Sequence, residues 1–152
     1  MGIGYEDAVV IYNRYLADEE ELFVGTRFDG VRVELTHGAN QMKSGMESAN
    51  KCVVKIPHSD ATKAYASPNQ WKEMDEDEKV KHFTFDPEYD NFFVIVKKED
   101  LGIDIVLPIG TVKSSDYEVG FFNFVKGKFD YAFSMSNVDT YSLIPRFEIG
   151  GK

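Results

Sequence analysis

Hydrophobic and polar residues alternate along the opening part of the chain with the two-residue period of β-strands. In residues 8–16, Val9, Ile11 and the polar Asn13 lie on the same face of the predicted strand. This pattern predicts a strand that is more exposed to solvent at one end. The segment 17–21, which is acidic from Asp18 on, predicts a turn, and the strand-forming residues that follow complete a hairpin over 8–28. We therefore expect the chain to begin with two antiparallel strands.

The next predicted strands flank a long polar segment. Asp29-Gly30 is a turn signal, and residues 31–35 after it alternate between aliphatic and charged side chains, as in a half-buried strand. Residues 36–49 are polar and contain glycine, which predicts a long loop of the kind that often has a function. Residues 51–56 then predict a further strand.

Two segments have the signals of short helices. Ser67 and Gln70 form a capping-box pattern, so residues 67–78 predict a helix that follows a long loop at about 58–68. A second capping-box pattern precedes residues 117–129, where aromatic and aliphatic side chains recur near helical spacing. The helical content is therefore expected to be small.

Residues that favour β-structure dominate the remaining segments. Strands are predicted at 83–85, 92–96, 133–139 and 144–151, and 92–96 is expected to be central. Many short strands with few helical segments argue against a parallel α/β fold. The predicted fold class is mainly β (α+β): a small antiparallel β-barrel or sandwich with two short helices, in one domain over residues 1–152.

Composition and charge narrow the classes of function. The 152 residues are 43% hydrophobic and 14% aromatic, which favours a compact core over disorder. The net charge of -9 disfavours free attraction to nucleic acid or to an anionic membrane. The one cysteine, Cys52, lies in a hydrophobic run and is predicted to be buried. The opening residues lack a signal-peptide pattern, and no stretch is apolar enough to span a bilayer, so we expect a cytosolic protein or assembly.

Sequence motifs for catalysis and metal binding are absent. The histidines, His37, His58 and His82, are far apart and have no cysteine beside them, so no zinc spacing is present. The four consecutive acids at 75–78 point in all directions on a helix, and the alternating acids at 86–90 lack the other ligands of a calcium loop. Nucleotide-binding glycine patterns and the nucleophile-elbow motif are missing as well. We therefore expect no enzymatic activity, no metal and no cofactor.

Two pairs of adjacent phenylalanines are candidates for a surface role. Phe92-Phe93 and Phe121-Phe122 place neighbouring rings on different faces of either a strand or a helix. One ring of each pair could be exposed, and exposed aromatic residues suit an interface. The alternative is that all four rings belong to the core.

Segments near both ends and in the middle of the chain carry a family resemblance. They are residues 11–15, residues 43–57 (from Lys43-Ser44-Gly45 to Pro57), residues 133–139 and residues 147–152. Together they resemble the small head-tail connector proteins of tailed bacteriophages, a family also labelled minor capsid, head-closure or stopper proteins. Such relatives often carry His or Trp just before the final strand; Arg146-Phe147 stands there in this chain, so no role is carried over to that position.

The resemblance implies a structural virion protein without a cofactor. Such proteins form a homo-oligomeric ring, expected to be a dodecamer, in the phage neck between the portal or adaptor proteins and the tail. The ring retains packaged DNA and docks the tail, and dsDNA passes through it without sequence-specific binding. The protein would be located in the virion after assembly in the bacterial host cytoplasm, with no membrane contact.

The resemblance also directs attention to two sets of residues. The loop at 36–49 is the candidate channel or gate loop, with 58–68 as the second choice. Its candidate residues are His37, Gly38, Asn40, Gln41, Lys43 and Gly45. The candidate interface residues are Phe92, Phe122, Arg146 and Lys152.

Other functions stay open at the level of the sequence. The nearest is a tail-completion or tail-terminator protein of the same neck, which would contact the tail tube. A second is a non-viral protein-binding module that uses a sheet edge or exposed aromatic residues. A third is an enzyme whose site has no recognisable motif.

Overall fold

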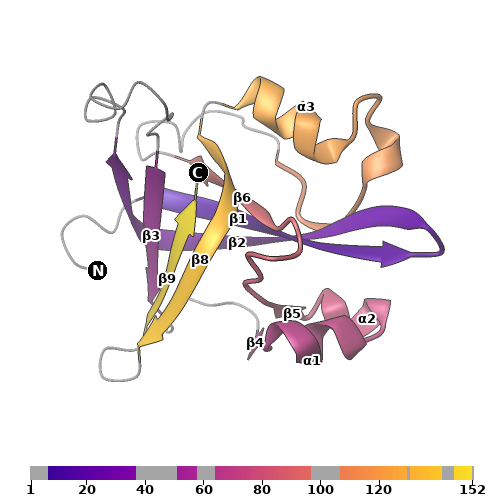
Figure 1. Ribbon diagram of the computed structural model, residues 1–152, viewed down its shortest axis with the longest axis horizontal. Coiled ribbons are helices and arrows are strands. Elements are labelled where there is room, and N and C mark those ends of the chain that lie inside the picture. Colours follow the sequence, from indigo (N-terminus) through magenta and orange to yellow (C-terminus); the bar gives the residue numbers. More distant parts are fainter. Residues whose placement is uncertain are drawn as a thin grey trace.

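The chain folds into a closed six-stranded antiparallel β-barrel with a few short helices, which confirms the predicted fold class (Figure 1). The structure is a computed structural model. It describes residues 7–36, 51–57, 64–96, 107–129, 131–141 and 146–151.

The described strands include the predicted ones in their order along the chain, and two short strands, at 64–65 and 110–113, were not predicted. The strands are β1 (Asp7–Ala17), β2 (Glu20–Thr36), β3 (Lys51–Pro57), β4 (Ala64–Tyr65), β5 (His82–Phe83), β6 (Phe92–Val96), β7 (Gly110–Lys113), β8 (Ala132–Tyr141) and β9 (Arg146–Gly151). The helices are α1 (Pro68–Glu73), α2 (Glu76–Lys79) and α3 (Phe121–Lys128), with a 3-10 turn at Ser114–Asp116.

The barrel has the strand order β1-β6-β8-β9-β3-β2. It closes because β2 pairs with β1 along one edge and with β3 along the other. β9 lies between β8 and β3, so strands from opposite ends of the chain belong to the same barrel. Closure pairs the strand edges that an open sheet would leave free.

The interior of the barrel is filled by side chains that alternate along its strands. Cys52, Val54 and Ile56 of β3 all point inward and are almost fully buried, as predicted for Cys52. The cluster consists of Val9, Ile11, Phe28, Val31, Cys52, Val54, Ile56, Phe83, Phe85, Phe93, Ile95, Phe133, Met135 and Ile149. Such a continuous apolar interior is the main source of stability for the barrel.

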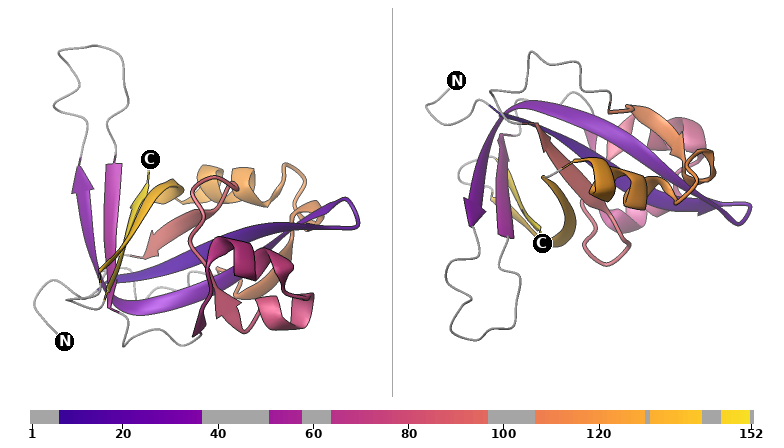
Figure 2. Two further views of the ribbon diagram at one scale, coloured as in Figure 1. Left: turned by 60° about the horizontal axis from the view of Figure 1, so that its bottom comes forward. Right: turned by 90° about the horizontal axis from the view of Figure 1, so that it is seen from above.

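The β1–β2 hairpin continues past the barrel and forms an arm (Figures 1 and 2). We define the arm as residues 12–17 of β1 and 20–25 of β2 together with β7, which pairs with Leu22–Gly25. Helix α3 covers one face of the arm, and α1 with α2 covers the other (Figure 1). The arm is therefore a small three-layered unit of its own beside the barrel.

The face of the arm beneath α3 is rich in aromatic rings. The rings of Tyr12 and Phe23 pack against Phe121 of α3, with centroid separations of 4.9 and 5.4 Å. Phe92 of β6 stacks on Tyr12 at 5.0 Å, so the same cluster joins the arm to the barrel. Ring pairs at these separations add to the stabilisation that comes from buried area alone.

The opposite face of the arm packs against the only tryptophan of the chain. Trp71 of α1 meets the ring of Tyr15 edge-on at 5.8 Å and donates its indole N–H to the carbonyl oxygen of Lys79. The Lys79 ammonium in turn donates to the carbonyl oxygens of Lys72 and Met74 at 3.2 and 2.5 Å. Lys79 thus satisfies the carbonyl end of α1 while its stem stays buried.

The predicted turn at Asp29-Gly30 is wrong, because β2 runs through it as one strand of 17 residues. The register of β1 against β2 explains why an Asp-Gly pair occurs at this position. Val9 pairs with Phe28 and Asp7 with Val31, so β2 has one more residue than β1 between these pairs. Gly30 takes the positive φ of 67° that such a bulge needs. The Asp-Gly pair therefore bends the strand toward β3 instead of reversing it.

The predicted helix at 67–78 is divided into α1 and α2. Its start is correct, because Ser67 and Gln70 form both hydrogen bonds of the capping box. The division has a local cause: Met74 is extended, and the side chain of Asp75 accepts the N–H of Glu78 at 2.9 Å to start a new turn.

The second helix begins later than the predicted residue 117. Gly120 has a φ of 86°, which cannot continue a helix, and α3 starts only after it. Its first N–H, on Phe121, donates to Ser114 Oγ at 3.0 Å, so the capping-box pattern predicted before residue 117 does not start the helix. The predicted loop at 58–68 is also shorter than expected, because β4 occupies 64–65 and pairs in parallel with β5; residues 58–63 lie outside the described part of the chain.

Gly151 sits where β9 crosses the packed interior of the barrel, and we expect Gly151→Ala to destabilise the protein by about 1–3 kcal/mol. A Cβ atom there would lie 2.5 Å from Phe93 Cζ and 2.7 Å from Phe133 Cβ. The matched control is Gly127→Ala in α3, where a Cβ meets nothing within 4 Å. That change is expected to stabilise by about 0.5–1 kcal/mol. Urea denaturation of both variants checks the pair, and equal stabilities would contradict the packing of Gly151.

Candidate functional site

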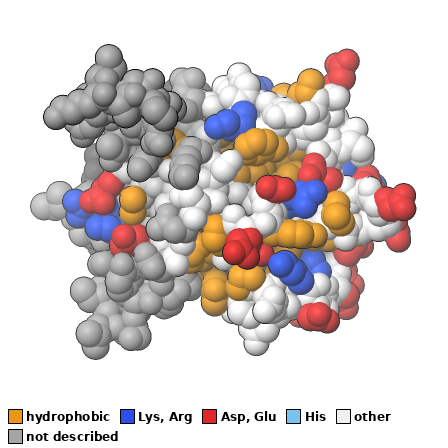
Figure 3. Space-filling view, viewed as in Figure 1, with side chains coloured by type: hydrophobic (Ala, Val, Ile, Leu, Met, Phe, Trp, Pro, Cys, Tyr) orange, Lys and Arg blue, Asp and Glu red, His pale blue; other side chains and the backbone are white. Residues whose placement is uncertain are grey.

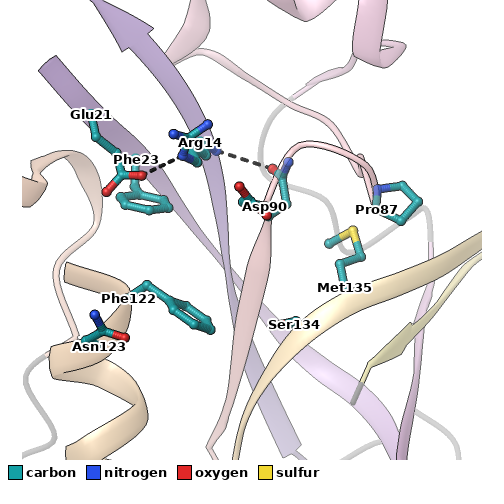
Figure 4. Close-up of a pocket in the computed structure, with 10 residues that line it drawn as sticks. Arg14, Glu21, Phe23, Pro87, Asp90, Phe122, Asn123, Ser134 and Met135 are labelled. Carbon is teal, nitrogen blue, oxygen red and sulfur yellow. Dashed lines mark hydrogen bonds and ion pairs between the residues drawn. The ribbon is translucent and has the colours of Figure 1, made fainter. Parts of the chain in front are cut away.

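A partly open pocket lies at the base of the arm, between α3, β8 and the turn before β6 (Figures 3 and 4). We call it the arm pocket. Its volume is about 290 Å³. The lining residues come from five segments of the chain and mix charged with apolar side chains. They are Arg14, Glu21, Phe23, Pro87, Asp90, Asn91, Phe122, Asn123, Ser134 and Met135.

The charged wall of the pocket is an ion pair across the arm. Arg14 pairs with Phe23 in the β1–β2 register, which places Glu21 diagonally opposite Arg14 on the same face. Arg14 Nε donates to Glu21 Oε2 at 2.6 Å (Figure 4). The guanidinium also lies over the ring of Tyr89, 5.3 Å from its centroid. Arg14 is thereby fixed as a wall of the pocket, with its side chain only 18% exposed.

Glu21 is an ionised carboxylate at neutral pH. Partial burial on its own would raise the pKa of Glu21, but hydrogen bonds from Arg14 and Ser114 and the positive charge of Arg14 outweigh burial and lower it below the usual value of 4.5. Ser114 Oγ also accepts the first N–H of α3. Glu21 therefore connects the ion pair of the arm to the start of α3.

The lowered pKa of Glu21 predicts an acid-dependent contribution to stability. A carboxyl group whose pKa is lower when folded stabilises the protein above its unfolded pKa, and that stabilisation disappears as the pH falls through the folded pKa. We expect Glu21→Gln to lower the melting temperature at pH 7 and the gap from wild type to close below about pH 4.5. Glu19→Gln in the exposed hairpin turn is the control for net charge. A gap that persists unchanged at pH 3 would contradict the ion pair.

A buried network of amides holds the turn that forms the other wall of the pocket. Asn13 Nδ2 donates to the carbonyl oxygen of Thr84 at 2.6 Å and to Asn91 Oδ1 at 2.8 Å, and Asn13 Oδ1 accepts the N–H of Thr84 at 3.2 Å. Asn91 Nδ2 donates back to the carbonyl oxygen of Asp86 at 3.0 Å. The segment from Thr84 to Asn91 is thus tied to β1 by side-chain hydrogen bonds.

Asp90 lies at the rim of this turn and faces the pocket (Figure 4). Its φ of 58° is in the left-handed region, which Asp and Asn tolerate better than most residues. Its negative charge attracts Arg14, but the structure gives its carboxylate no hydrogen bond within the described residues. Asp90 is therefore an exposed carboxylate at the rim of the arm pocket.

The end of the arm is acidic and carries an exposed aliphatic residue. Asp18 and Glu19 form the hairpin turn, both with positive φ, and Leu16 beside them is 52% exposed. Glu20 Oε1 accepts a hydrogen bond from Ser115 at 2.9 Å. Acidic side chains gather at this end of the molecule, at the right edge of Figure 3. The arm thus presents a negatively charged tip with an apolar contact point.

Residues 5–103 match a family of unknown function, DUF6751. The chain belongs to this family. No curated protein and no solved structure matches the chain. The matched region of the DUF6751 family runs from β1 to β6 and contains Asn13, Arg14, Glu21, Asp90 and Asn91. The charged wall of the pocket and the amide network therefore lie within the matched region, whereas α3, β8 and β9 lie beyond it.

The structure gives different outcomes for the four predicted interface residues of this DUF6751 member. The prediction that Phe92 lies at the surface is wrong. Its side chain is fully buried, because α3 and the arm cover the side of β6 on which its ring lies. Phe122 is half-buried, packs its ring edge-on against Phe92 at 4.9 Å, and lines the arm pocket. Arg146 begins β9 opposite Pro57, and its side chain lies outside the described part, as does Lys152.

The candidate gate loop connects β2 to β3. All six of its named residues lie outside the part of the chain that the structure describes. They are His37, Gly38, Asn40, Gln41, Lys43 and Gly45. The gate therefore stays a prediction from the sequence.

Groups of three or more metal-ligand side chains do not occur among the described residues. Of the alternating acids at 86–90, Asp86 accepts the N–H of Glu88 and pairs with Lys72 at 3.3 Å. His82 contacts the carbonyl oxygen of Glu78 through Nδ1 at 2.9 Å. Both contacts fit a structural role for these side chains.

None of the helices within the described ranges is long and apolar enough to cross a membrane.

Sequence reasoning missed the arm pocket as a site. Arg14 and Glu21 were visible only as the polar end of a strand and as part of an acidic turn, and Asp90 as one acid among many. A usable signal was the spacing itself: in a tight hairpin, Arg14 and Glu21 lie on the same face and can pair. The contribution of α3 and β8 to the pocket could not be read from spacing.

Proposed function

We propose that this protein is a structural virion protein of the bacteriophage neck, a subunit of a ring between the portal or adaptor and the tail that retains packaged DNA and docks the tail. The observation that carries the proposal is the arm. It extends beyond a closed barrel, and its tip presents Leu16 and acidic residues to the surroundings. An element that projects in this way is suited to reach a neighbouring protein.

A ring of identical subunits needs two different surfaces that fit each other around a closed circle. A closed barrel supplies a rigid body without free edges that could pair at random. An arm fixed to it on both faces by α3 and α1–α2 supplies a defined direction of contact. This combination supports an assembly role over a role in which the chain acts alone.

The acidity of the chain fits passage of DNA through such a ring. The net charge is -9, and the hairpin turn itself contributes Asp18 and Glu19. Like charges repel, so acidic subunits around a channel keep the phosphate backbone from adhering. The charge thus supports sliding of DNA without sequence-specific binding.

The described segments that resemble connector proteins lie in strands that build the barrel, and residues 12–15 of the first segment continue into the arm. Residues 11–15 lie in β1 and 53–57 in β3, while 133–139 and 147–151 lie in the paired strands β8 and β9. These segments come together in the framework of one closed sheet although they are far apart in the sequence. The resembling segments therefore belong to the framework of the fold, which supports the proposal at the level of architecture.

Location and copy number in purified virions test the proposal. Cryo-electron microscopy of the neck and quantitative mass spectrometry should place the protein below the portal in the portal's own copy number. A position against the tail tube, after tails are separated from heads, would favour the alternative of a tail-completion or terminator protein. Absence from purified virions would favour a binding module and overturn the proposal.

The role of the arm predicts the effect of one surface substitution. Leu16→Asp adds a charge to an exposed apolar contact and leaves the fold intact, so we expect at least about a tenfold loss of infectious particles in a complementation assay. Ile109→Asp is the matched control, because Ile109 is equally exposed at 53% but lies at the base of the arm. If the Leu16→Asp variant restored full infectivity, the arm tip would not be part of the interface.

A further inference from the structure

We infer that the arm pocket binds a lysine or arginine side chain from a different, basic protein. The inference rests on the proposed function for the identity of that protein as a neighbour in an assembly. The chemistry of the pocket stands on its own contacts. It can therefore be tested in the isolated chain.

The charges that line the pocket leave an excess of one negative charge. Glu21 and Asp90 contribute two carboxylates, and Arg14 contributes one guanidinium. The Arg14 charge is already matched by Glu21 at 2.6 Å. The charge of Asp90 is the remainder, and it favours a cation over an anion as the occupant.

Besides the terminal nitrogens of Arg14, which are donors, the polar groups that remain available in the pocket are mainly acceptors. The amide of Asn91 is used on both sides, by Asn13 and the N–H of Arg14 at its oxygen and by the carbonyl of Asp86 at its nitrogen. Asn123 Nδ2 donates to the carbonyl oxygen of Val119 at 3.0 Å. Within the described residues, the structure gives no hydrogen bond to the Asp90 carboxylate or the Ser134 hydroxyl. An ammonium or guanidinium group, which only donates, complements this set.

The floor of the pocket suits the apolar stem of a basic side chain. Phe122, Met135 and Pro87 line it below the charged rim (Figure 4). Lysine and arginine cover apolar surface with their methylene groups while the charged head reaches a polar edge. An aromatic ring such as Phe122 also attracts a cation that approaches its face.

Two other kinds of occupant fit less well. A purely apolar group would remove water from Asp90 and Arg14 without replacing their interactions. A second copy of this chain has 17 basic against 26 acidic side chains, so its surface offers fewer cations to the pocket than the surface of a basic protein does. Charge complementarity therefore points to a partner that is basic and differs from this chain.

The test uses the full chain labelled with ¹⁵N and three probes. These are N-acetyl-lysine methylamide, the norleucine analogue, which has the same stem without the charge, and the glutamate analogue. The lysine probe should shift the amide signals of Asp90, Asn91, Phe122 and Asn123, and it should bind about fivefold more tightly than the norleucine probe. Asp90→Asn keeps the shape and tolerates the positive φ, and it should weaken lysine binding about fivefold. Asp77→Asn on exposed α2 should leave binding unchanged.

Several results would overturn the inference. They are equal binding of lysine and norleucine, tighter binding of the glutamate probe, and no pocket shifts with lysine up to about 50 mM. Shifts at the pocket that grow with protein concentration alone would assign it to a second copy and also contradict the inference. Because virions are not involved, a negative result here leaves the neck role intact, and a protein absent from virions leaves the pocket chemistry intact.

Discussion

Replacing Asn13 with leucine is expected to lower the free energy of unfolding by about 3 kcal/mol or more. Leucine has a similar volume, but it removes every bond of the buried amide and leaves the N–H and carbonyl of Thr84 without their partner. Asn91 Oδ1 loses its shortest donor as well. Each buried polar group left unsatisfied costs about 1–3 kcal/mol. Chemical denaturation followed by circular dichroism measures the loss.

The control for Asn13→Leu is Asn69→Leu, an identical change at an exposed position of α1. A surface change of this kind is expected to stay within about 0.5 kcal/mol of wild type. Hydrogen exchange gives a second test, because release of the 84–91 turn should speed exchange at Glu88 and Met135, whose N–H groups donate to Asp86 and Asn91. If Asn13→Leu were as stable as wild type, the amide network would not hold this turn.

Trp71→Ala is expected to cost about 3–5 kcal/mol, the largest effect of a single truncation on the arm. The side chain is 1% exposed and fills the space between α1 and the arm. Its removal leaves a cavity beside Tyr15 and takes away the indole donor to the carbonyl oxygen of Lys79. The cation-π contact with the Lys79 ammonium, 5.2 Å away, is lost as well.

Two variants calibrate the effect of Trp71→Ala. Trp71→Phe keeps most of the apolar volume but loses the N–H, so we expect an intermediate loss of about 1–2 kcal/mol. Glu73→Ala, exposed on the same helix, should change stability by less than about 0.5 kcal/mol. Faster hydrogen exchange at Leu22 and Val24 in Trp71→Ala, with the barrel strands unchanged, would locate the damage in the arm. A uniform loss of protection over the barrel would contradict an arm with its own core.

The strands of the barrel could be predicted because their local patterns agree with their final surroundings. Residues 92–96 are five buried residues in a row, as expected for a strand covered on both faces, and they form β6. The capping box at Ser67 and Gln70 likewise depends only on neighbours in the sequence. The prediction of a turn at Asp29-Gly30 failed because the same dipeptide occurs in hairpin turns and in bulges. Which of the two forms depends on the register of β1 against β2.

The arm and its pocket depend on contacts that sequence spacing does not contain. Phe92 was expected to be exposed as one of two adjacent rings, but both faces of β6 are covered, by the barrel interior and by α3. The position of α3 follows from Gly120 and Ser114, which redirect the chain before the helix starts. Asp90 reaches the pocket only because Asn13, far away in the sequence, holds its turn. Neither the position of α3 nor that of Asp90 leaves a periodic pattern in the sequence.

The most direct test of the neck role is electron microscopy of particles from a phage in which this gene is disrupted, together with the DNA content of each head. The account predicts free tails beside heads that have lost their DNA, because a ring that closes the head and docks the tail is missing. Restoration by the wild-type gene, but not by Leu16→Asp, would link the defect to the arm. Normal, infectious, DNA-filled virions with attached tails would contradict the account.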